Sequence, residues 1–388
     1  MRWIGAVVLL LVLSGCGDGR HELLFVRTAD GLSVVDASGG RTLFTATGAV
    51  PSRDWSRMLR AEPDGPRTRL SVLDPSTGAV SGTRTVDGGL DVRAVSSDGL
   101  SVALAPPGGY ANGRPTTPVV VSGPRSSRRY DLEGNYEPEA FSLDRSTLFV
   151  IEYMPALAPD RYRVRQLDLG TGEVSGVYSI DKYIQEAMRG TARTQAPAPD
   201  GRRLYTLYGT GDRSFVHVLA LDEKWAHCID LPPMFGKGAE QDMALAVSPD
   251  SSRLHVADAN AGLVGVFETA THAIVRTVRI DLPGHGPVRL AATHDRIYVG
   301  RDGRVVAIDA SSLARTRAWS VPGVVSGIQA ADDSVYVALG DRIAVLDVRS
   351  GRVLRTLRGP GMTGIEQLGL GGSPVGSRAA LTCACSIG

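Results

Sequence analysis

The sequence predicts an all-β protein, a single β-propeller in which four-stranded blades form a closed ring. Short runs of β-branched and alternating apolar residues follow one another along the chain, and turn residues separate them. A turn of the type Asp-x-x-Thr-Gly occurs at residues 74–78 and 168–172, and equivalent turns repeat at intervals of 38 to 54 residues. A repeat of roughly 40–45 residues with four strands is typical of propeller blades and argues against two separate domains.

One repeat shows the four strands most clearly. Residues 243–250, 253–257, 262–271 and 273–280 are short strand-like runs, and a turn signal separates each from the next. The first two runs meet at a Ser-Pro-Asp corner, where Pro presets φ and Asp can bond its own backbone. Related corners occur at residues 96–99, 142–145 and 198–201, so the same meander is expected in other repeats.

The number of blades follows from the Asp-x-x-Thr-Gly turn. Its equivalents begin at Asp36, Asp74, Ser122, Asp168, Asp222, Glu268, Asp309 and Asp347. Eight blades are therefore favoured, with seven as the alternative because the third turn is weak. The first repeat supplies only three strands, and one strand is left over at residues 364–370. We expect this C-terminal strand to complete the first blade, because closure removes exposed sheet edges.

The first 15 residues are typical of a signal peptide. Arg2 precedes an apolar run at residues 4–13, which is too short to span a hydrocarbon core of ~30 Å as a helix. Residues 13–16 read Leu-Ser-Gly-Cys and resemble the lipobox of bacterial lipoproteins. The resemblance implies cleavage before Cys16, lipidation of Cys16 and anchoring on the extracytoplasmic face of the bacterial cell membrane. An ordinary secretory signal with a chance cysteine is the alternative.

The expected domain plan follows from these segments. Residues 1–15 are the signal peptide, 16–22 the lipidated Cys and tether, 23–371 the propeller and 372–388 a C-terminal tail. The net charge of +1 offers no basic field, which argues against a nucleic-acid partner. Membrane contact is expected through the lipid anchor only, and we expect a monomer.

The three cysteines after Cys16 do not form a disulfide framework. Cys383 and Cys385 lie in the tail, two positions apart. They are candidates for a disulfide with each other or with Cys228, for a soft-metal site such as Cu(I), or for inert thiols. An oxidising location favours a disulfide.

Several strands carry a family resemblance. Residues 254–260, 297–299 and 335–337 resemble the second strand of YVTN-type, WD-like β-propeller repeats, and residues 264–278 resemble the hairpin that follows. The likeness is clear from residue 243 to residue 356. It implies a cell-surface or periplasmic propeller, in a family whose members mostly bind rather than catalyse and share no catalytic residues. Fold alone does not assign function.

Motifs for catalysis and for metals are weak. His21 and Glu22 begin like a zinc-binding HExxH motif, but Phe25 stands where the second His should be. Asp258 and Asn260 alternate as in a calcium loop, without the later bidentate Glu. We therefore expect no catalytic residue, no cofactor and no resident metal, and we favour binding over catalysis. The alternative is an enzyme with its site at the channel mouth, a quinoprotein-like dehydrogenase or a metal-dependent lactonase or hydrolase.

Long insertions cluster on one face. In a propeller, connections between strands two and three and between blades share a face, which we call the long-loop face. Its insertions are residues 106–118, 131–139, 153–163, 180–194 and 231–242, and residues 182–189 are expected to form a short helix. Candidate binding residues on this rim are Tyr110, Glu133, Tyr136, Glu137, Glu139, Tyr153, Arg161, Tyr183, Arg189, Phe235, Lys237 and Glu240.

Residues 131–139 are the most acidic insertion, and three interpretations remain open for them. They form a solvated acidic loop, a calcium or other cation site, or an acid/base pair. For the face as a whole, we predict that it binds a protein or a cell-envelope component. The alternative is a set of surface insertions without a binding role.

Overall fold

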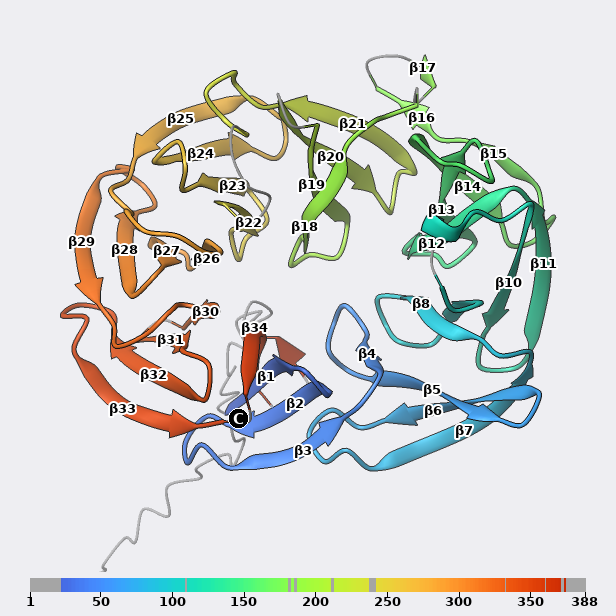
Figure 1. The fold of residues 1–388 in the computed structure, drawn as a ribbon, viewed down its shortest axis with the longest axis horizontal. Helices are drawn as coiled ribbons and strands as arrows, with labels where there is room; N and C mark the ends of the chain where they lie inside the picture. Colours follow the sequence, from blue (N-terminus) through green and yellow to red (C-terminus); the bar gives the residue numbers. More distant parts are fainter. Residues whose placement is uncertain are drawn as a thin grey trace, which may run out of the picture.

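The computed structural model shows an eight-bladed ring (Figure 1). It describes residues 22–108, 110–180, 183–184, 187–210, 213–236, 242–331, 333–359, 361–370 and 373–374. The prediction of eight blades is confirmed, and the alternative of seven is wrong. Cys16, Cys383 and Cys385 lie outside the described residues, as do residues 1–15, the predicted signal peptide, and nearly all of residues 372–388.

The first four blades are built from consecutive strands, apart from the inner strand of blade 1. Blade 1 contains β1 (Glu22–Thr28), β2 (Gly31–Asp36), β3 (Thr42–Ala46), β34 (Met362–Leu370) and β35 (Ser373–Pro374). Blade 2 contains β4 (Ala49–Pro51), β5 (Met58–Asp64), β6 (Arg67–Leu73) and β7 (Val80–Asp87). Blade 3 contains β8 (Asp91–Val95), β9 (Val102–Ala105), β10 (Thr116–Ser122) and β11 (Ser127–Glu133), with the 3₁₀ turn η1 (Tyr110–Asn112). Blade 4 contains β12 (Asn135–Phe141), β13 (Thr147–Met154), β14 (Arg161–Asp168) and β15 (Val174–Gly176).

The other four blades follow the same plan. Blade 5 contains β18 (Thr191–Pro197), β19 (Arg203–Gly209), β20 (Ser214–Ala220) and β21 (Trp225–Asp230), extended by β16 (Tyr178–Ser179) and β17 (Tyr183–Ile184). Blade 6 contains β22 (Met243–Val247), β23 (Arg253–Asp258), β24 (Leu263–Glu268) and β25 (Ile274–Arg279). Blade 7 contains β26 (Arg289–Ala292), β27 (Arg296–Arg301), β28 (Arg304–Asp309) and β29 (Arg315–Ser320). Blade 8 contains β30 (Gly327–Ala330), β31 (Ser334–Ala338), β32 (Arg342–Asp347) and β33 (Val353–Arg358).

The ring closes through its C-terminal strand, as predicted. β34 pairs antiparallel with β1, and Figure 1 shows the two strands side by side although they come from opposite ends of the chain. Leu24 and Val26 of β1 pack in one apolar cluster with Ile343 and Leu357 of blade 8. The Tyr336 hydroxyl of blade 8 also donates a hydrogen bond to Glu22 at 2.8 Å. The chain ends are therefore joined by a ladder, an apolar core and a polar contact.

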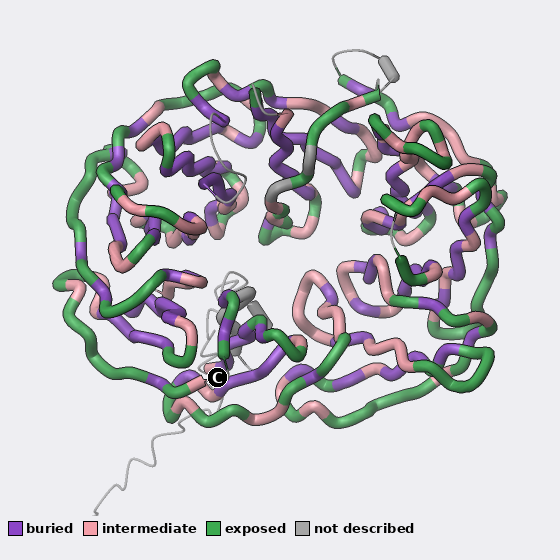
Figure 2. Tube along the Cα trace, viewed as in Figure 1, coloured by how far each residue is buried: buried purple, intermediate pink, exposed green. Residues whose placement is uncertain are grey.

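The apolar cores lie between the blades. Leu263 and Phe267 of β24 pack against blade 5, whereas Val264 and Val266 of the same strand pack against blade 7. Both faces of such a strand are buried, which explains its nearly continuous apolar sequence. Each fully buried Val or Leu contributes about 1.5–3 kcal/mol. Figure 2 shows the buried residues within the blades and many of the exposed ones along the outer strands.

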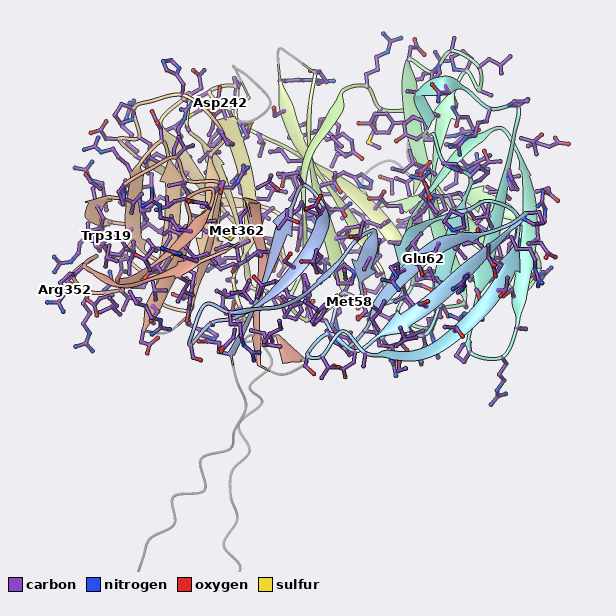
Figure 3. All side chains as sticks on the ribbon, turned by 60° about the horizontal axis from the view of Figure 1, so that its bottom comes forward. Met58, Glu62, Asp242, Trp319, Arg352 and Met362 are labelled. Carbon is purple, nitrogen blue, oxygen red and sulfur yellow. The ribbon has the colours of Figure 1, made fainter. Side chains whose placement is uncertain are left out.

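Two separate structural features require glycine at the last position of the Asp-x-x-Thr-Gly turn. Gly351 has φ of +69°, a conformation that L side chains rarely adopt. The space where its Cβ would stand is also filled by the ring of Trp319, from the outer strand of blade 7. Trp319 lies toward the outer edge of the molecule (Figure 3). In the same way, the Phe44 ring fills the space beside Gly78, and Leu357 fills the space beside Gly40 at the closing seam.

Arginines of the outer strands add a polar contact between blades. Arg128 of β11 donates to the backbone carbonyl of Gly170 in the next blade at 2.8 Å. The same relation joins Arg276 to Ser312 and Arg355 to Ala37, each at 3.1 Å. At the closing seam, the turn at residues 36–40 therefore receives both a large side chain, Leu357, and a guanidinium, Arg355, from the preceding blade.

The aspartates of these turns organise the backbone. Oδ1 of Asp74 accepts hydrogen bonds from the backbone N–H groups of Ser76 and Thr77, both at 2.9 Å, and from the Ser76 hydroxyl. Asp309 accepts the equivalent bonds from Ser311 and Ser312. The hydrogen bond from Ser76 is the largest influence lowering the pKa of Asp74, and the backbone N–H of Ser312 has that role for Asp309.

These turns predict a stability that decreases in acid. A carboxyl whose pKa is lowered by folding stabilises the protein above its unfolded pKa of ~3.9, and this contribution is lost as the pH falls below that value. The double variant Asp74→Ala/Asp309→Ala should therefore lose more unfolding free energy, relative to the wild type, at pH 7 than at pH 3. Urea unfolding at both pH values measures the difference. The exposed Asp281→Ala variant serves as the control, and a pH-independent loss in the double variant would contradict the argument.

The tight contact at Gly351 predicts a graded loss of stability. Gly351→Ala should be destabilised by about 1–2 kcal/mol from its positive φ, and by about 1–3 kcal/mol more from overpacking against Trp319. Gly65 provides a matched control, because its φ is +62° and nothing lies within 4 Å of the added Cβ. Gly65→Ala should therefore show only the first loss. Equal losses of unfolding free energy in the two variants would show that the contact between Trp319 and residue 351 does not limit stability.

Candidate functional site

Strands of blades 3 to 5 and two of the long connections line a cavity of about 660 Å³. The lining residues on β8, β12 and β18 belong to inner strands, so the cavity opens beside the central channel. Pro159, Asp160 and Gly190 from the long connections form its outer part. The full lining is Arg93, Glu137, Glu139, Ile151, Tyr153, Pro159, Asp160, Arg161, Tyr162, Gly190, Ala192, Thr194, Gln195, Thr206 and Tyr208.

Four of the predicted binding residues line this cavity: Glu137, Glu139, Tyr153 and Arg161. Arg189 is exposed and pairs with Asp160 at 3.4 Å, which brings it to the cavity edge. Glu133 is exposed at the end of β11, outside the cavity. Tyr110 belongs to η1 and Tyr183 to β17, and Lys237 and Glu240 lie outside the described residues.

Two of the predicted rim residues are core residues instead. Phe235 is 1% exposed and packs between blades 5 and 6. Tyr136 is 6% exposed and packs between blades 3 and 4. The prediction of a surface role is wrong for both, because the sequence does not show that Tyr136 lies on a strand and that the connection of Phe235 packs its ring inward.

Residues 131–139 are not a loop. β11 ends at Glu133, β12 begins at Asn135, and Gly134 alone connects them with φ of +124°. The burial along β12 alternates, with Tyr136, Pro138 and Ala140 buried and Glu137 and Glu139 half-buried. Glu137 and Glu139 are therefore the polar positions of an inner strand that lines the cavity, whereas Asp131 and Glu133 are exposed on the outer strand β11. The interpretation as a solvated acidic loop is wrong for Glu137 and Glu139.

The predicted helix at residues 182–189 does not form over the described part of this segment. Tyr183 and Ile184 are in the short strand β17, and Met188 forms an isolated β-bridge with Tyr162. Backbone hydrogen bonds run in both directions between Met188 and Tyr162. Pairing with another blade thus replaces the local bonds that a helix would have made.

Sequence analysis found Tyr153 but missed the rest of the aromatic wall of the cavity, Tyr162 and Tyr208. The three rings follow one another with centroids 6.0 and 5.1 Å apart, and Phe215, outside the cavity lining, stacks behind Tyr208 at 5.3 Å. Burial raises the pKa of Tyr208 well above its usual value, so its hydroxyl stays neutral. Tyr162 and Tyr208 lie within strands and look like core residues in the sequence. Their position near strand ends on the long-loop face was the available signal.

Two of the three carboxylates in the cavity have cationic partners. Glu137 lies 3.2 Å from Arg93 and 3.8 Å from Arg114. Burial raises the pKa of Glu137, and the two guanidinium groups oppose that effect. Asp160 pairs with Arg161 at 3.3 Å and with Arg189 at 3.4 Å. Both arginines that line the cavity, Arg93 and Arg161, are therefore engaged.

Glu139 is held differently. The side-chain amide of Gln195 donates to Glu139 Oε1 at 2.5 Å and to the Thr206 hydroxyl at 3.1 Å. Over the part of the chain that the structure describes, no cationic side chain lies within 4 Å of Glu139. Burial raises the pKa of Glu139, while the more distant Arg53 and the bond from Gln195 oppose that effect.

The pKa of Arg53 is affected in turn by burial and by the charge of Glu139. Arg53 lies in the connection between β4 and β5, and burial lowers its pKa to about 10, although the charge of Glu139 opposes that effect. Its Nη1 is buried and makes no hydrogen bond with any described residue. The two groups therefore act on each other through space, without a direct bond.

A smaller cavity of about 320 Å³ lies between blades 6 and 7. Its charged residues Asp242 and Arg301 form a buried ion pair at 2.5 Å. Elsewhere, the Cys228 thiol lies 3.8 Å from the Met188 sulfur. Among the described residues, no group of three or more His, Cys, Asp or Glu side chains is placed to hold a metal ion. No helix in the described ranges is long and apolar enough to cross a membrane.

Comparisons with known proteins identify the fold alone. No protein-family model and no curated protein sequence match the chain. Among solved structures, the dihydro-heme d1 dehydrogenase NirN in complex with DHE is 14% identical over 92% of this chain and 75% of that chain, with a TM-score of 0.57. Apo AztD from Citrobacter koseri is 14% identical over 90% and 97% (TM-score 0.54), and BamB from Moraxella catarrhalis is 14% identical over 84% and 93% (TM-score 0.50). At these identities the likeness supports the propeller and assigns no activity.

Proposed function

We propose that this protein is a lipid-anchored, extracytoplasmic binding protein that captures a protein or cell-envelope component through its long-loop face. The cavity of about 660 Å³ carries the proposal. It is concave, partly aromatic and built from three rigid blades, and it presents a few oriented polar groups, as binding sites do. The YVTN-type resemblance of the repeats supports the same role.

The proposed address rests on a different part of the chain. In the lipobox-like residues 13–16, Cys16 follows an apolar run of signal-peptide length after only Ser14 and Gly15. Two or more acyl chains would hold the protein stably at the membrane, whereas a single chain gives only marginal binding. The ring would then present its long-loop face to partners in the extracytoplasmic space.

An enzyme at the same cavity is the second candidate function. Glu137 and Glu139 are two residues apart on β12, and burial raises the pKa of both. Paired carboxyls in a desolvated cleft are a common arrangement for acid–base chemistry. This candidate requires that a small molecule is converted, whereas the binding proposal requires a partner that leaves the protein unchanged.

The binding proposal predicts that capture depends on the cavity. In crosslinking capture from the cell envelope, Tyr153→Ala/Arg161→Ala should lose the specifically recovered partner. Tyr178→Ala should retain it, because Tyr178 is 52% exposed and lies outside the cavity. Equal recovery by the two variants, or no specific partner with the wild type, would remove the support for this face.

The anchor predicts a defined change in localisation. Cys16→Ser should shift the protein from the membrane fraction to the soluble extracytoplasmic fraction, because the acylated thiol is lost. Mass spectrometry of the wild-type N-terminus should show a lipid-modified peptide that starts at residue 16. An unmodified Cys16, or unchanged membrane association of the variant, would contradict lipid anchoring. The capture experiment above is independent of this result.

A further inference from the structure

We infer that the cavity recognises a primary ammonium or guanidinium group, presented as a lysine or arginine side chain of a protein partner. The inference rests on the proposed binding function and names the chemistry of the partner. It follows from the charges, the aromatic wall and the size of the cavity.

The carboxylates give the first step. Glu137 and Asp160 already have arginine partners within 4 Å, and their charges are compensated within the protein. Glu139 has a neutral donor, Gln195, on Oε1, and none of the described residues donates to its Oε2. A half-buried carboxylate without a contacting cation is less stable than a paired one, because it has lost hydration without gaining a counter-ion. A cation from outside would supply that partner.

The position of Arg53 does not remove this need. Its guanidinium acts on Glu139 through space but makes no bond to it, and Arg53 is not part of the cavity wall. A direct charged hydrogen bond is shorter and stronger than such a distant interaction. A ligand cation that enters from the long-loop face would reach Glu139 directly.

The aromatic wall gives the second step. Tyr153 lines the same cavity as Glu139 and is half-buried, and the ring of a tyrosine attracts cations through its face. The buried rings of Tyr162 and Tyr208 stack on each other and form the apolar backing of this wall. The Thr206 hydroxyl, also in the lining, accepts one hydrogen from Gln195 and keeps a further lone pair for a ligand donor. An ammonium or guanidinium group has several N–H donors and no acceptor, which matches these acceptors.

The arginines of the cavity argue against an anionic ligand. Arg93 and Arg161 are the cations in the lining, and each is paired with a carboxylate of the same cavity. An anion would have to displace Glu137 or Asp160 and leave it unpaired, which is strongly unfavourable in a partly buried site. A cation requires no such rearrangement.

The size of the cavity favours a basic side chain that is part of a polypeptide over a free ammonium group. About 660 Å³ lies in the range of sites for drug-sized ligands and exceeds the needs of one ammonium group. The apolar stem of lysine or arginine can pack along the tyrosines while its charged end reaches Glu139. Flanking residues of the partner would fill the remaining space.

The test uses the mature full chain in detergent with small probes of defined charge. Binding of Nα-acetyl-lysine methylamide and Nα-acetyl-arginine methylamide is measured by calorimetry and compared with the norleucine and glutamate analogues. At least one basic probe should bind about tenfold more tightly than the norleucine probe, which corresponds to about 1.4 kcal/mol. Equal affinity for the norleucine probe, or tighter binding of the glutamate probe, would overturn the inference.

Variants locate the binding at Glu139. Glu139→Gln should weaken the basic probe about tenfold, whereas Glu133→Gln, an exposed residue outside the cavity, should not change it. Tyr153→Leu keeps the carboxylate and should weaken the same probe about threefold. Thermal unfolding checks that each variant is folded, and Glu139→Ala replaces Glu139→Gln where it is not. Unchanged affinity in a folded Glu139 variant would contradict the assignment.

The result is separable from the proposed function. Cavity-dependent capture of a partner, together with no preference for basic probes, would refute the cationic ligand and leave the binding role intact. Failure of both experiments would refute both.

Discussion

The pairing of β34 with β1 is the constraint on which the rest of the structure depends. It joins Leu24 to Leu368, residues from opposite ends of the chain, in one antiparallel ladder. No single blade can bury its two faces alone, since the apolar residues of each strand are shared between two neighbours. An open ring would leave two terminal blades with exposed apolar faces and unpaired edges. Closure by a distant strand also costs chain entropy, and the burial at the closing seam offsets it.

Closure leaves the outer strands as the remaining edges of the sheets. β25, β29 and β33 of blades 6 to 8 each carry two arginines and no acidic residue, and most of their side chains are exposed. Charged side chains on an edge oppose pairing with another sheet, so these arginines protect the ring from association. Arg276 and Arg355 have a second role, because each bonds a carbonyl of the next blade. The outer edge is therefore both protected and tied to the seams.

The repeats were predictable from the sequence, whereas the cavity was predictable only in part. The preference for a turn depends on a few adjacent residues, so residues such as Asp74 and Gly78 identify one turn in each blade. The spacing of these turns along the sequence then predicts a ring of blades. Glu137 and Glu139 were found as charges, but their strand was mistaken for a loop because Asp and Glu are depleted in strands. Tyr208 escaped notice because a cavity wall and a core have the same composition. Pairing between Met188 and Tyr162 overrode a local helix pattern, which a single sequence does not reveal.

The difference between blades 6 to 8 and blades 3 to 5 explains why the candidate site lies in blades 3 to 5. Blades 6 to 8 have regular hairpins, and their charged side chains lie mainly at exposed edges and turns. Blades 3 to 5 carry the long connections and hold Glu139 half-buried, with a neutral amide in place of a contacting counter-ion. Such an arrangement lowers the stability of the free protein, because Gln195 and the distant Arg53 offset the desolvation of the carboxylate only in part. The closed ring supplies enough burial elsewhere to tolerate this loss, and the bond network of Gln195 and Thr206 keeps the carboxylate oriented. Binding of a cation at Glu139 would therefore remove this unfavourable desolvation, and the gain would contribute to the binding free energy. A cavity in which every carboxylate already had a contacting cation would offer no such contribution.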